Sequence, residues 1–363
     1  MRTIPSDIND TLAHYQTEVN KRLEVFFDQK IKEAAEISEY TREVALNAHE
    51  YTLRGGKRLR PIFCIYGYKC FSDDNIEAII AASISLELMQ SYLLIHDDVM
   101  DEDELRRGKP TFHIVCRALG ERLFGTTSNN KALKFGENIA IAAGDLLEAY
   151  GEEVLVKSPF ESQYVKKAVA KYAEIVKQVG YGQILDITAG LKGSVTEDEI
   201  MMIHKLKTAS YTIEGPLHIG ALLAGANDAD LQMLSNYGVP LGLAFQIQDD
   251  ILGLFGSEEK TGKPVGSDIR EGKKTLLIFH ALKRCTDKEK EVLLKALGNP
   301  RVTLKEIERI RDIVRETGSL DYSKTLVDEL TARAIQAIKD APFRTEAKEF
   351  LTQIADFIGT REY

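Results

Sequence analysis

The sequence predicts an all-α protein that folds as one domain. Apolar residues recur at helical spacing through most of the 363 residues. Strand-like alternation flanked by tight-turn dipeptides does not recur, which argues against a parallel sheet. No low-complexity linker divides the chain, and no internal repeat is found beyond two acidic motifs. We therefore expect a single helical domain over residues 1–363.

The apolar periodicity also places the individual helices. In chain order they are expected at residues 12–54, 61–68, 75–96, 138–156, 164–188, 197–224, 229–255, 274–283, 304–316 and 322–357. Gly55 and Gly56 break the first helix, and Pro61 suits the first turn of the next because its missing N–H costs nothing there. The polar stretch from Gly120 to Lys134 is expected to form a surface loop or hairpin.

The composition is that of an ordinary soluble globular protein. Hydrophobic residues make up 44% of the chain and charged residues 28%, enough to bury a large core. The net charge of −9 argues against a general nucleic-acid binder, although it leaves room for a local cationic pocket.

Targeting and redox signals favour the cytoplasm. No stretch reaches the roughly 18 apolar residues of a membrane span, because the richest, residues 78–89, contains Ser83, Ser85 and Glu87. The N-terminus lacks the apolar region of a signal peptide. The four cysteines show no metal-binding spacing and are expected to be reduced core thiols. These are Cys64, Cys70, Cys116 and Cys285.

Two acidic pairs in otherwise apolar helices are the strongest functional signal. Asp97 and Asp98 begin the run DDVMD, and Asp249 and Asp250 lie in FQIQDDILG. Residues i and i+4 share a helix face, so Asp97 and Asp101 project together. Clustered carboxylates repel one another unless cations compensate them. Hard oxygen ligands of this kind predict Mg²⁺, with Mn²⁺ as a substitute.

A solvated helix end is the plainer interpretation of the first acidic run. Its context argues for a site, because Arg106, Arg107 and Gly108 follow directly after a long apolar helix. An EF-hand loop is excluded, since the required glycine and glutamate positions are not filled. Arginine donates in pairs to phosphate oxygens and keeps its charge. Metals and arginines together predict a site for a polyanion.

Four motifs in family order resemble the trans-isoprenyl diphosphate synthases of the polyprenyl synthetase family. They are GGKRLRP from Gly55, DDVMD with RRG from Asp97, LKTAS from Leu206, and FQIQDDILG followed by TGKPVGSDIREGKKT. The resemblance covers about residues 45–360 and is nearest to archaeal-type short-chain enzymes. It implies an isoprenoid synthase fold, with helices around a central prenyl-binding cavity, and a homodimer. Such enzymes condense isopentenyl diphosphate head-to-tail with dimethylallyl, geranyl or farnesyl diphosphate.

The resemblance also implies roles for individual residues. The isopentenyl diphosphate site would comprise Gly56, Lys57, Arg60, Gln90 and Arg107, with Gln90 at a position that is His in many relatives. The allylic diphosphate site would comprise Arg106, Lys207, Thr208, Gln246, Lys263 and Lys273. Metal ligands would be Asp97 and Asp101 for two ions and Asp249 for a third, with Asp98 and Asp250 as supporting or occasional ligands. Asp186 and Asp268 match positions near metal-bound water.

The implied chemistry is Mg²⁺-assisted ionisation of the allylic substrate. Arg106, Lys207 and Lys273 would stabilise pyrophosphate as it leaves. The isopentenyl double bond would then attack the allylic cation, with Thr208 and Gln246 stabilising the ionising carbon and pyrophosphate accepting the proton. The second motif departs from the strict family form, since Gly253 stands where a third aspartate often occurs.

Two other functions share some of these features. A class I terpene cyclase also ionises allylic diphosphates, but it usually carries an Asn/Ser/Glu metal triad and does not need GGKRLRP. A non-catalytic partner subunit tends to lose acidic or basic site residues, whereas this chain keeps both acidic pairs and both arginines.

Product length depends on the apolar helix that precedes Asp97. In related short-chain enzymes an aromatic residue five positions before the acidic run forms the floor of the pocket, and Tyr92 stands there. The next residue is the smaller Leu93, a pairing similar to that of geranylgeranyl diphosphate synthases. We therefore favour a C20 product, with farnesyl (C15) or longer products as alternatives. An ideal helix nevertheless puts Leu93 nearer than Tyr92 to the face of Asp97.

Overall fold

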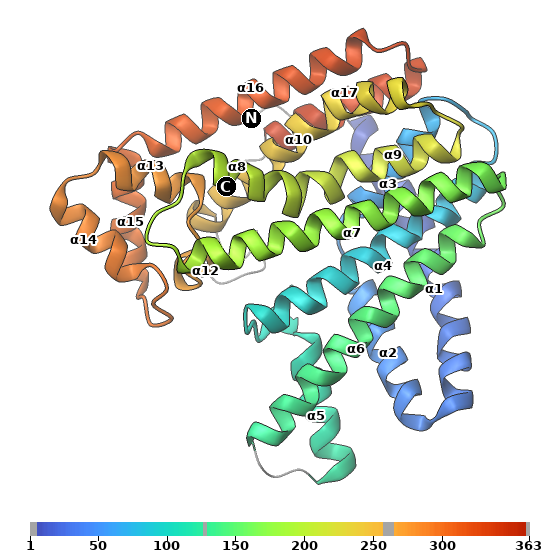
Figure 1. Cartoon of the computed structure of the whole chain (residues 1–363), viewed down its shortest axis with the longest axis horizontal. Coiled ribbons are helices and arrows are strands. Elements are labelled where there is room, and N and C mark those ends of the chain that lie inside the picture. The colour runs from blue at the N-terminus through green and yellow to red at the C-terminus, as the bar shows by residue number, and fades with distance from the viewer. Residues whose placement is uncertain (1–5, 126–128, 257–264, 361–363) are drawn as a thin grey trace.

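The all-α prediction is confirmed by the computed structural model, which describes residues 6–125, 129–256 and 265–360 (Figure 1). Helices joined by short turns make up most of these residues. The described strands are β1 (Leu105–Arg106) and β2 (Lys109–Pro110), which pair antiparallel and turn the chain back at Arg107 and Gly108.

The predicted first helix is two helices, α1 (Ser6–Ile37) and α2 (Glu39–Leu53). Ser38 separates them because its side chain caps α2, accepting a hydrogen bond from the Thr41 backbone N–H at 3.1 Å. The two helices fold back on each other, so this N-cap determines where the hairpin turns.

The most apolar helix lies in the middle of the fold. After α3 (Leu59–Lys69), α4 (Ile76–Met100) carries the first acidic motif at its C-terminal end. By length and composition α4 could cross a membrane, although no such stretch was expected. Yet 72% of its most apolar window is buried within the protein, as in the core helix of a globular domain.

The expected loop from Gly120 to Lys134 is wrong for most of its length. α5 (Phe112–Phe124) and α6 (Asn129–Val156) form a helical hairpin, and residues 126–128 at its tip lie outside the described residues. The prediction rested on the polar residues of this stretch, which here lie on the exposed faces of two helices. Gly120 lies inside α5 at a close approach, where a Cβ would be 2.5 Å from Phe135 Cδ1.

The segment predicted as one helix over residues 197–224 contains a change of helix type. α7 (Ser162–Leu191) is followed by α8 (Glu197–Ile203), the 11-residue π-helix η1 (His204–Glu214) and α9 (Gly215–Leu223). π-Helices bond from i to i+5 and occur mostly at functional sites. η1 contains Lys207 and Thr208.

The C-terminal third begins with α10 (Asp228–Phe255), which carries the second acidic motif. It continues through α12 (Ser267–Arg270), α13 (Leu276–Arg284), α14 (Asp287–Ala296), α15 (Leu304–Glu316), α16 (Ser319–Asp340) and α17 (Thr345–Gly359). α14 was not predicted. The helix predicted over residues 322–357 is broken after Asp340, where Pro342 interrupts the backbone hydrogen bonding.

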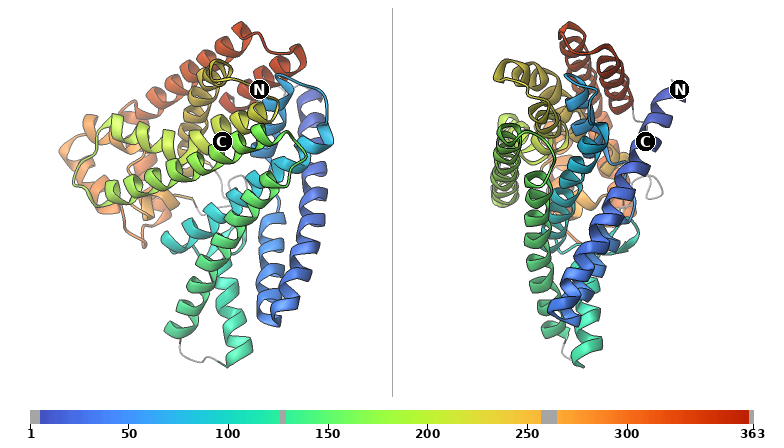
Figure 2. Two further views of the ribbon diagram at one scale, coloured as in Figure 1. Left: turned by 45° about the vertical axis from the view of Figure 1, so that its right-hand side comes forward. Right: turned by 90° about the vertical axis from the view of Figure 1, so that its right-hand side faces the viewer.

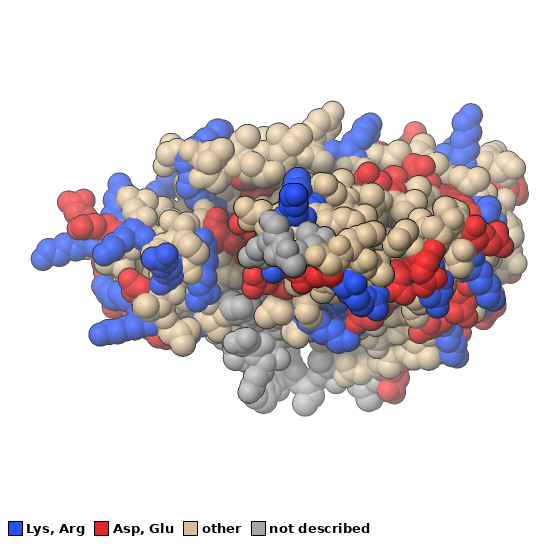
Figure 3. All heavy atoms as spheres, turned by 90° about the horizontal axis from the view of Figure 1, so that it is seen from below, with Lys and Arg blue, Asp and Glu red and all other residues tan. Residues whose placement is uncertain are grey.

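The helices are arranged around two apolar cores. In Figure 1, α7, α10 and α16 run across the molecule while the α1–α2 and α5–α6 hairpins project below, and Figure 2 shows the same elements from the side. α10 contributes Leu234, Tyr237 and Leu241 to the first core, and Ile247 and Ile251 to the second. It therefore joins the two halves of the domain. On the face shown in Figure 3, acidic and basic side chains are intermixed.

Two glycines in α7 provide a matched test of the packing around η1. A Cβ on Gly182 would lie 2.6 Å from the Lys207 backbone nitrogen, whereas one on Gly180 would meet nothing within 4 Å. Gly182→Ala should therefore lower the free energy of unfolding by about 1–3 kcal/mol, and Gly180→Ala should raise it by about 0.5–1 kcal/mol. Urea denaturation measures both. Equal stability of the two variants would contradict the close approach of α7 to η1.

Candidate active site

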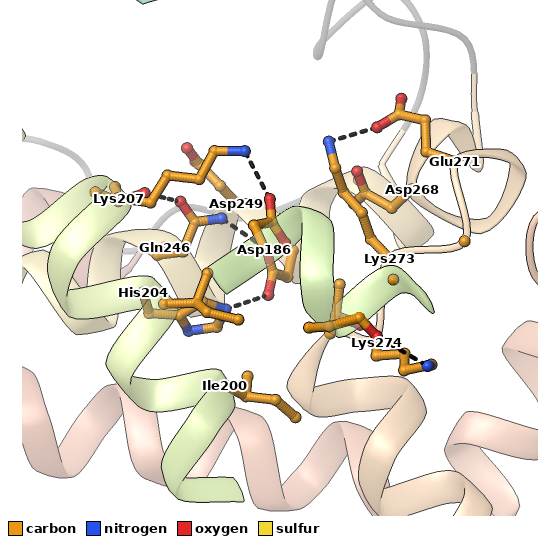
Figure 4. Close-up of a pocket in the computed structure, with 18 of the residues that line it drawn as sticks. Asp186, Ile200, His204, Lys207, Gln246, Asp249, Asp268, Glu271, Lys273 and Lys274 are labelled. Carbon is orange, nitrogen blue, oxygen red and sulfur yellow. Dashed lines mark hydrogen bonds and ion pairs between the residues drawn. The ribbon is translucent and has the colours of Figure 1, made fainter. Parts of the chain in front are cut away.

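A cavity of about 1570 Å³ lies between α4, α7, η1, α10 and the segment around α12. Its charged lining comes from positions far apart in the sequence (Figure 4). The carboxylates are Asp97, Asp101, Asp186, Asp249, Asp250, Asp268 and Glu271, and the cations are Lys57, Arg106, Lys192, Lys207, Lys273 and Lys274. The two acidic motifs thus line one cavity.

Asp97 and Asp101 form the α4 side of this cavity. Each lies beside a lysine: Lys207 Nζ is 3.4 Å from Asp97 Oδ1, and Lys273 Nζ is 3.2 Å from Asp101 Oδ2. Burial raises the pKa of Asp101, Lys273 lowers it, and the neighbouring charge of Asp97 raises it further. This side of the cavity therefore carries negative charge that requires nearby cations.

Asp98 lies behind the acidic wall, which is the pair of carboxylates of Asp97 and Asp101 on the α4 side of the cavity. Its side chain is fully buried, and its two oxygens accept hydrogen bonds from Tyr51 Oη at 2.7 Å and from Arg106 Nε. Burial raises the pKa of Asp98 to about 6, although Arg106 opposes the shift. Its carboxylate holds Arg106 in place and, unlike that of Asp97, is turned away from the cavity.

The two lysines reach the site from different elements (Figure 4). Lys207 extends from η1 and donates to Asp186 Oδ2 at 2.6 Å. Lys273 follows α12 and also pairs with Glu271. Burial lowers the pKa of Lys207, but Asp97 and Asp186 outweigh it and raise the pKa above its usual value. Both side chains are therefore held as cations facing the acidic wall.

The α10 side of the cavity combines acidic and amide groups. Asp249 lines the cavity, and Asp250 Oδ1 accepts a hydrogen bond from Gln246 Nε2 at 2.7 Å. Gln246 Oε1 in turn accepts from Thr208 Oγ1 at 2.6 Å. His204 Nε2 lies 3.3 Å from Asp250 Oδ2. The sequence did not indicate His204, because a lone histidine in a helix carries no recognisable signal.

A carboxylate from another segment lies beside Gly253. A Cβ on Gly253 would be 2.6 Å from Asp268 Oδ2, so the Asp268 carboxylate of α12 occupies the space next to this glycine. Gly253 replaces the third aspartate of the family pattern, but the carboxylate of Asp268 keeps an acidic group near that position in the cavity. This long-range substitution could not be read from the motif alone.

The basic turn before α3 lies next to the same cavity. Lys57 lines it, with Nζ 4.8 Å from the centre of the Phe357 ring. Arg60 lies over the ring of Tyr211 at 4.2 Å and donates to Thr212 Oγ1 at 2.8 Å. Lys57 and Arg60 thus lie next to the N-terminal turn of α3, where unpaired backbone N–H groups also favour anions.

Gly56 and Arg107 fit together at this turn. Gly56 has φ +111°, and a Cβ there would lie 3.1 Å from Arg107 Nη2. Arg107 Nη1 donates to the Gly55 carbonyl at 2.6 Å. Burial lowers the pKa of Arg107, and the charge of Glu87 opposes that shift. A second, small cavity is lined by Gln90, Arg106 and Arg107, and Gln90 Oε1 has no hydrogen-bond partner among the described residues.

A buried ion pair that the sequence did not reveal supports the turn. Arg58 adopts φ +52° and pairs with Glu87 of α4 at 2.6 Å, with both side chains buried. Arg58 Nε also donates to Asn20 Oδ1 of α1 at 2.8 Å, and Gln16 of α1 donates to the Gly56 carbonyl at 2.6 Å. α1 and α4 therefore fix the turn from both sides.

Three predicted residues lie outside this arrangement. Tyr92 and Leu93 are half-buried on α4 and are not part of the cavity lining described above. The Tyr92 ring packs edge-on against His96 at 4.9 Å. Lys263 lies outside the described residues.

The donor set suits a hard divalent cation. Asp97, Asp101 and Asp249 present carboxylates to one cavity, and Asp250 Oδ2 is buried without a hydrogen-bond partner among the described residues. Within residues 6–125, 129–256 and 265–360, no three acidic, His or Cys side chains are already gathered closely enough to hold a metal alone. A cation here would need phosphate or water as further ligands, which is the usual coordination of Mg²⁺.

The chain is similar to known proteins over nearly its whole length. The family model for polyprenyl synthetase matches residues 42–314. Geranylgeranyl diphosphate synthase from Sulfolobus acidocaldarius is 35% identical over 84% of this chain and 86% of the relative. Short chain isoprenyl diphosphate synthase from Methanocaldococcus jannaschii is 37% identical over 87% and 89%. The structure of geranylgeranyl pyrophosphate synthase from Corynebacterium glutamicum, complexed with isoprenyl diphosphate and magnesium, superposes with a TM-score of 0.90 at 30% identity, covering 96% and 99% of the two chains.

Proposed function

Because this chain belongs to the polyprenyl synthetase family and is a trans-prenyltransferase, we propose that it condenses isopentenyl diphosphate with allylic diphosphates to give geranylgeranyl diphosphate. One observation carries the proposal: the acidic ends of α4 and α10 line a single cavity that also contains Lys57, Arg106, Lys207 and Lys273. A site with this charge pattern suits diphosphates that arrive with divalent cations.

Two groups of side chains would hold the two diphosphates. The allylic group comprises Arg106, Lys207, Thr208, Gln246, Lys263 and Lys273, and the isopentenyl group comprises Gly56, Lys57, Arg60, Gln90 and Arg107. The close fit of Gly56 to Arg107 and the unpartnered Gln90 oxygen support the second group. Arg106 lines both cavities, so it is positioned to act at the boundary between the two substrates.

Asp97, Asp101 and Asp249 are the proposed ligands for Mg²⁺, with three ions per site and Mn²⁺ as a substitute. Asp98 and Asp250 would support them, since both already accept hydrogen bonds from neighbouring side chains. Bound Mg²⁺ would supply positive charge to the oxygens of the leaving diphosphate. The ion pairs of Lys207 and Lys273 with the acidic wall support this assignment, because they mark where cations are needed.

The cationic side chains of the site stabilise the negative charge that develops on the leaving diphosphate. Arg106, Lys207 and Lys273 bind the diphosphate that leaves with the electron pair of the allylic C–O bond. The π electrons of isopentenyl diphosphate form the new C–C bond, and loss of a proton to pyrophosphate restores a double bond. Oxygens of Thr208 and Gln246 line the cavity where the allylic carbon would lie, and apolar walls exclude water.

Assembly and location are also proposed. Apolar side chains lie exposed along α6 and α7, a surface suited to a homodimer. They are Ile141, Leu146, Val156, Tyr181, Ile184, Leu185, Ile187 and Leu191. The free thiols of Cys64, Cys70 and Cys116 are buried, in keeping with a reducing cytoplasm.

Product chromatography tests the proposed reaction. Purified protein supplied with isopentenyl and dimethylallyl diphosphates and Mg²⁺ should form longer linear diphosphates. Asp97→Ala should lower turnover at least a hundredfold, since several kcal/mol of stabilisation are lost and about 1.4 kcal/mol is tenfold in rate. Excess EDTA should abolish turnover. A hydrocarbon product would indicate a cyclase, and an inactive wild-type protein would indicate a partner subunit.

Steady-state kinetics separate the two diphosphate groups. Arg60→Ala should raise the KM for isopentenyl diphosphate at least about tenfold more than the KM for the allylic substrate, because a charged phosphate contact is lost at one site. Lys207→Ala should have the opposite preference. If both variants affected both substrates equally, the assignment of the two groups would be wrong.

Product length tests the role of Tyr92. Removing its ring in Tyr92→Ala should let the prenyl tail extend, because each further buried CH₂ contributes roughly 0.8 kcal/mol. Products should then shift from C20 to C25 or beyond while total turnover changes modestly. Leu93→Ala is the matched control on the adjacent helix position. If only Leu93→Ala lengthened the product, Leu93 and not Tyr92 would form the floor of the prenyl pocket.

A further inference from the structure

His204 has a place in the site but no role in the reaction described above. It is the first residue of η1, is only 7% exposed and lines the main cavity. Its Nε2 lies 3.3 Å from Asp250 Oδ2, and Asp250 is itself only 6% exposed. The contact joins the π-helix to the second acidic motif through two buried side chains.

The contact continues as a chain of hydrogen bonds. Gln246 Nε2 donates to Asp250 Oδ1 at 2.7 Å, and Thr208 Oγ1 donates to Gln246 Oε1 at 2.6 Å. An ionised carboxylate can only accept, so the amide must turn its NH₂ group toward Asp250 and its oxygen toward Thr208. Thr208 therefore donates its hydroxyl proton to the hydrogen bond with Gln246 Oε1. The remaining lone pairs of Thr208 are then free to face the cavity.

Close packing makes this chain of short side chains feasible. A Cβ on Gly242 of α10 would lie 2.5 Å from Ala209 Cα of η1, so the two helices touch through their backbones. His204 and Thr208 both precede Ala209 on η1, and their partners Asp250 and Gln246 both follow Gly242 on α10. The wider i to i+5 bonding of the π-helix thus brings both residues against α10.

We propose that His204 is a positioning residue that fixes the Asp250–Gln246–Thr208 chain through the contact of its Nε2 with Asp250 Oδ2 at 3.3 Å. The inference rests on the proposed prenyl transfer and deepens it. Asp250 Oδ2 accepts no well-aligned hydrogen bond among the described residues, and without His204 it would also lose the contact with Nε2 at 3.3 Å. The carboxylate would then rotate toward the cations of the cavity and release the amide of Gln246. Thr208 would lose its fixed orientation toward the ionising carbon.

A competing role for Asp250 makes a different prediction. If Asp250 binds a metal ion directly, the contact with His204 acts on a metal ligand, and removing it should change the Mg²⁺ dependence of the enzyme. If His204 acts through Gln246 and Thr208, its removal should slow the chemical step. Substrate and metal binding would then stay as they are in the wild type.

Three variants of the full-length enzyme distinguish these outcomes. His204→Leu removes the donor at similar volume, and His204→Gln keeps an N–H donor near the position of Nε2. His218→Leu is the matched control, since His218 is a buried histidine of α9 that bonds to the Leu231 carbonyl at 3.0 Å. Thermal melting of each variant checks that it is folded. Steady-state kinetics give kcat, both KM values and the half-saturating Mg²⁺ concentration.

We expect His204→Leu to lower kcat by roughly tenfold to a hundredfold, the cost of misplacing a group at the reacting centre. Both KM values and the Mg²⁺ requirement should stay unchanged, and His204→Gln should recover most of kcat. Wild-type kcat in His204→Leu would overturn the proposal. So would equal losses in His204→Leu, His204→Gln and His218→Leu, or a raised Mg²⁺ requirement. Absence of product from the wild-type enzyme would instead refute the prenyl transfer itself.

Discussion

Mutual repulsion among carboxylates is the constraint on which the rest of the site depends. The acidic ends of α4 and α10 line one cavity, and buried negative charges are costly unless they are paired. Lys207 and Lys273 supply the pairing, and Arg106 does the same for the buried Asp98. These cations come from a π-helix, a turn and a two-residue strand. The cations that pair with these carboxylates thus come from segments other than regular α-helices.

Close helix packing holds this charge arrangement in place. Glycines at positions 182 and 242 let α7 and α10 touch the backbone of η1 at Lys207 and Ala209. On the other side of the site, the buried pair of Arg58 and Glu87 fixes the basic turn to α4. Both groups of diphosphate-binding side chains thus lie on closely packed elements. Rigid mounting favours catalysis because charged groups need little reorganisation as the allylic bond breaks.

The sequence predicted the fold class, both acidic motifs and the basic turn, because each depends on local spacing or on charge. It missed the end of α5 and the start of α6, because a polar run on exposed helix faces resembles a loop. It missed η1, because apolar periodicity reports which face is buried and not which carbonyl each N–H bonds. The Asp268 carboxylate beside Gly253 and the contact of His204 with Asp250 depend on the packing of separate elements, which no local pattern encodes.

The account holds that Asp97, Asp101 and Asp249 are the groups that bind metal, while Asp98 supports Arg106. Anomalous diffraction from crystals soaked with Mn²⁺ and inorganic pyrophosphate tests this most directly. Peaks should lie beside Asp97 and Asp101 and beside Asp249, with Lys207 and Lys273 moved from the carboxylates to phosphate oxygens. Peaks coordinated by Asp98, or no metal between the two acidic motifs, would contradict the account.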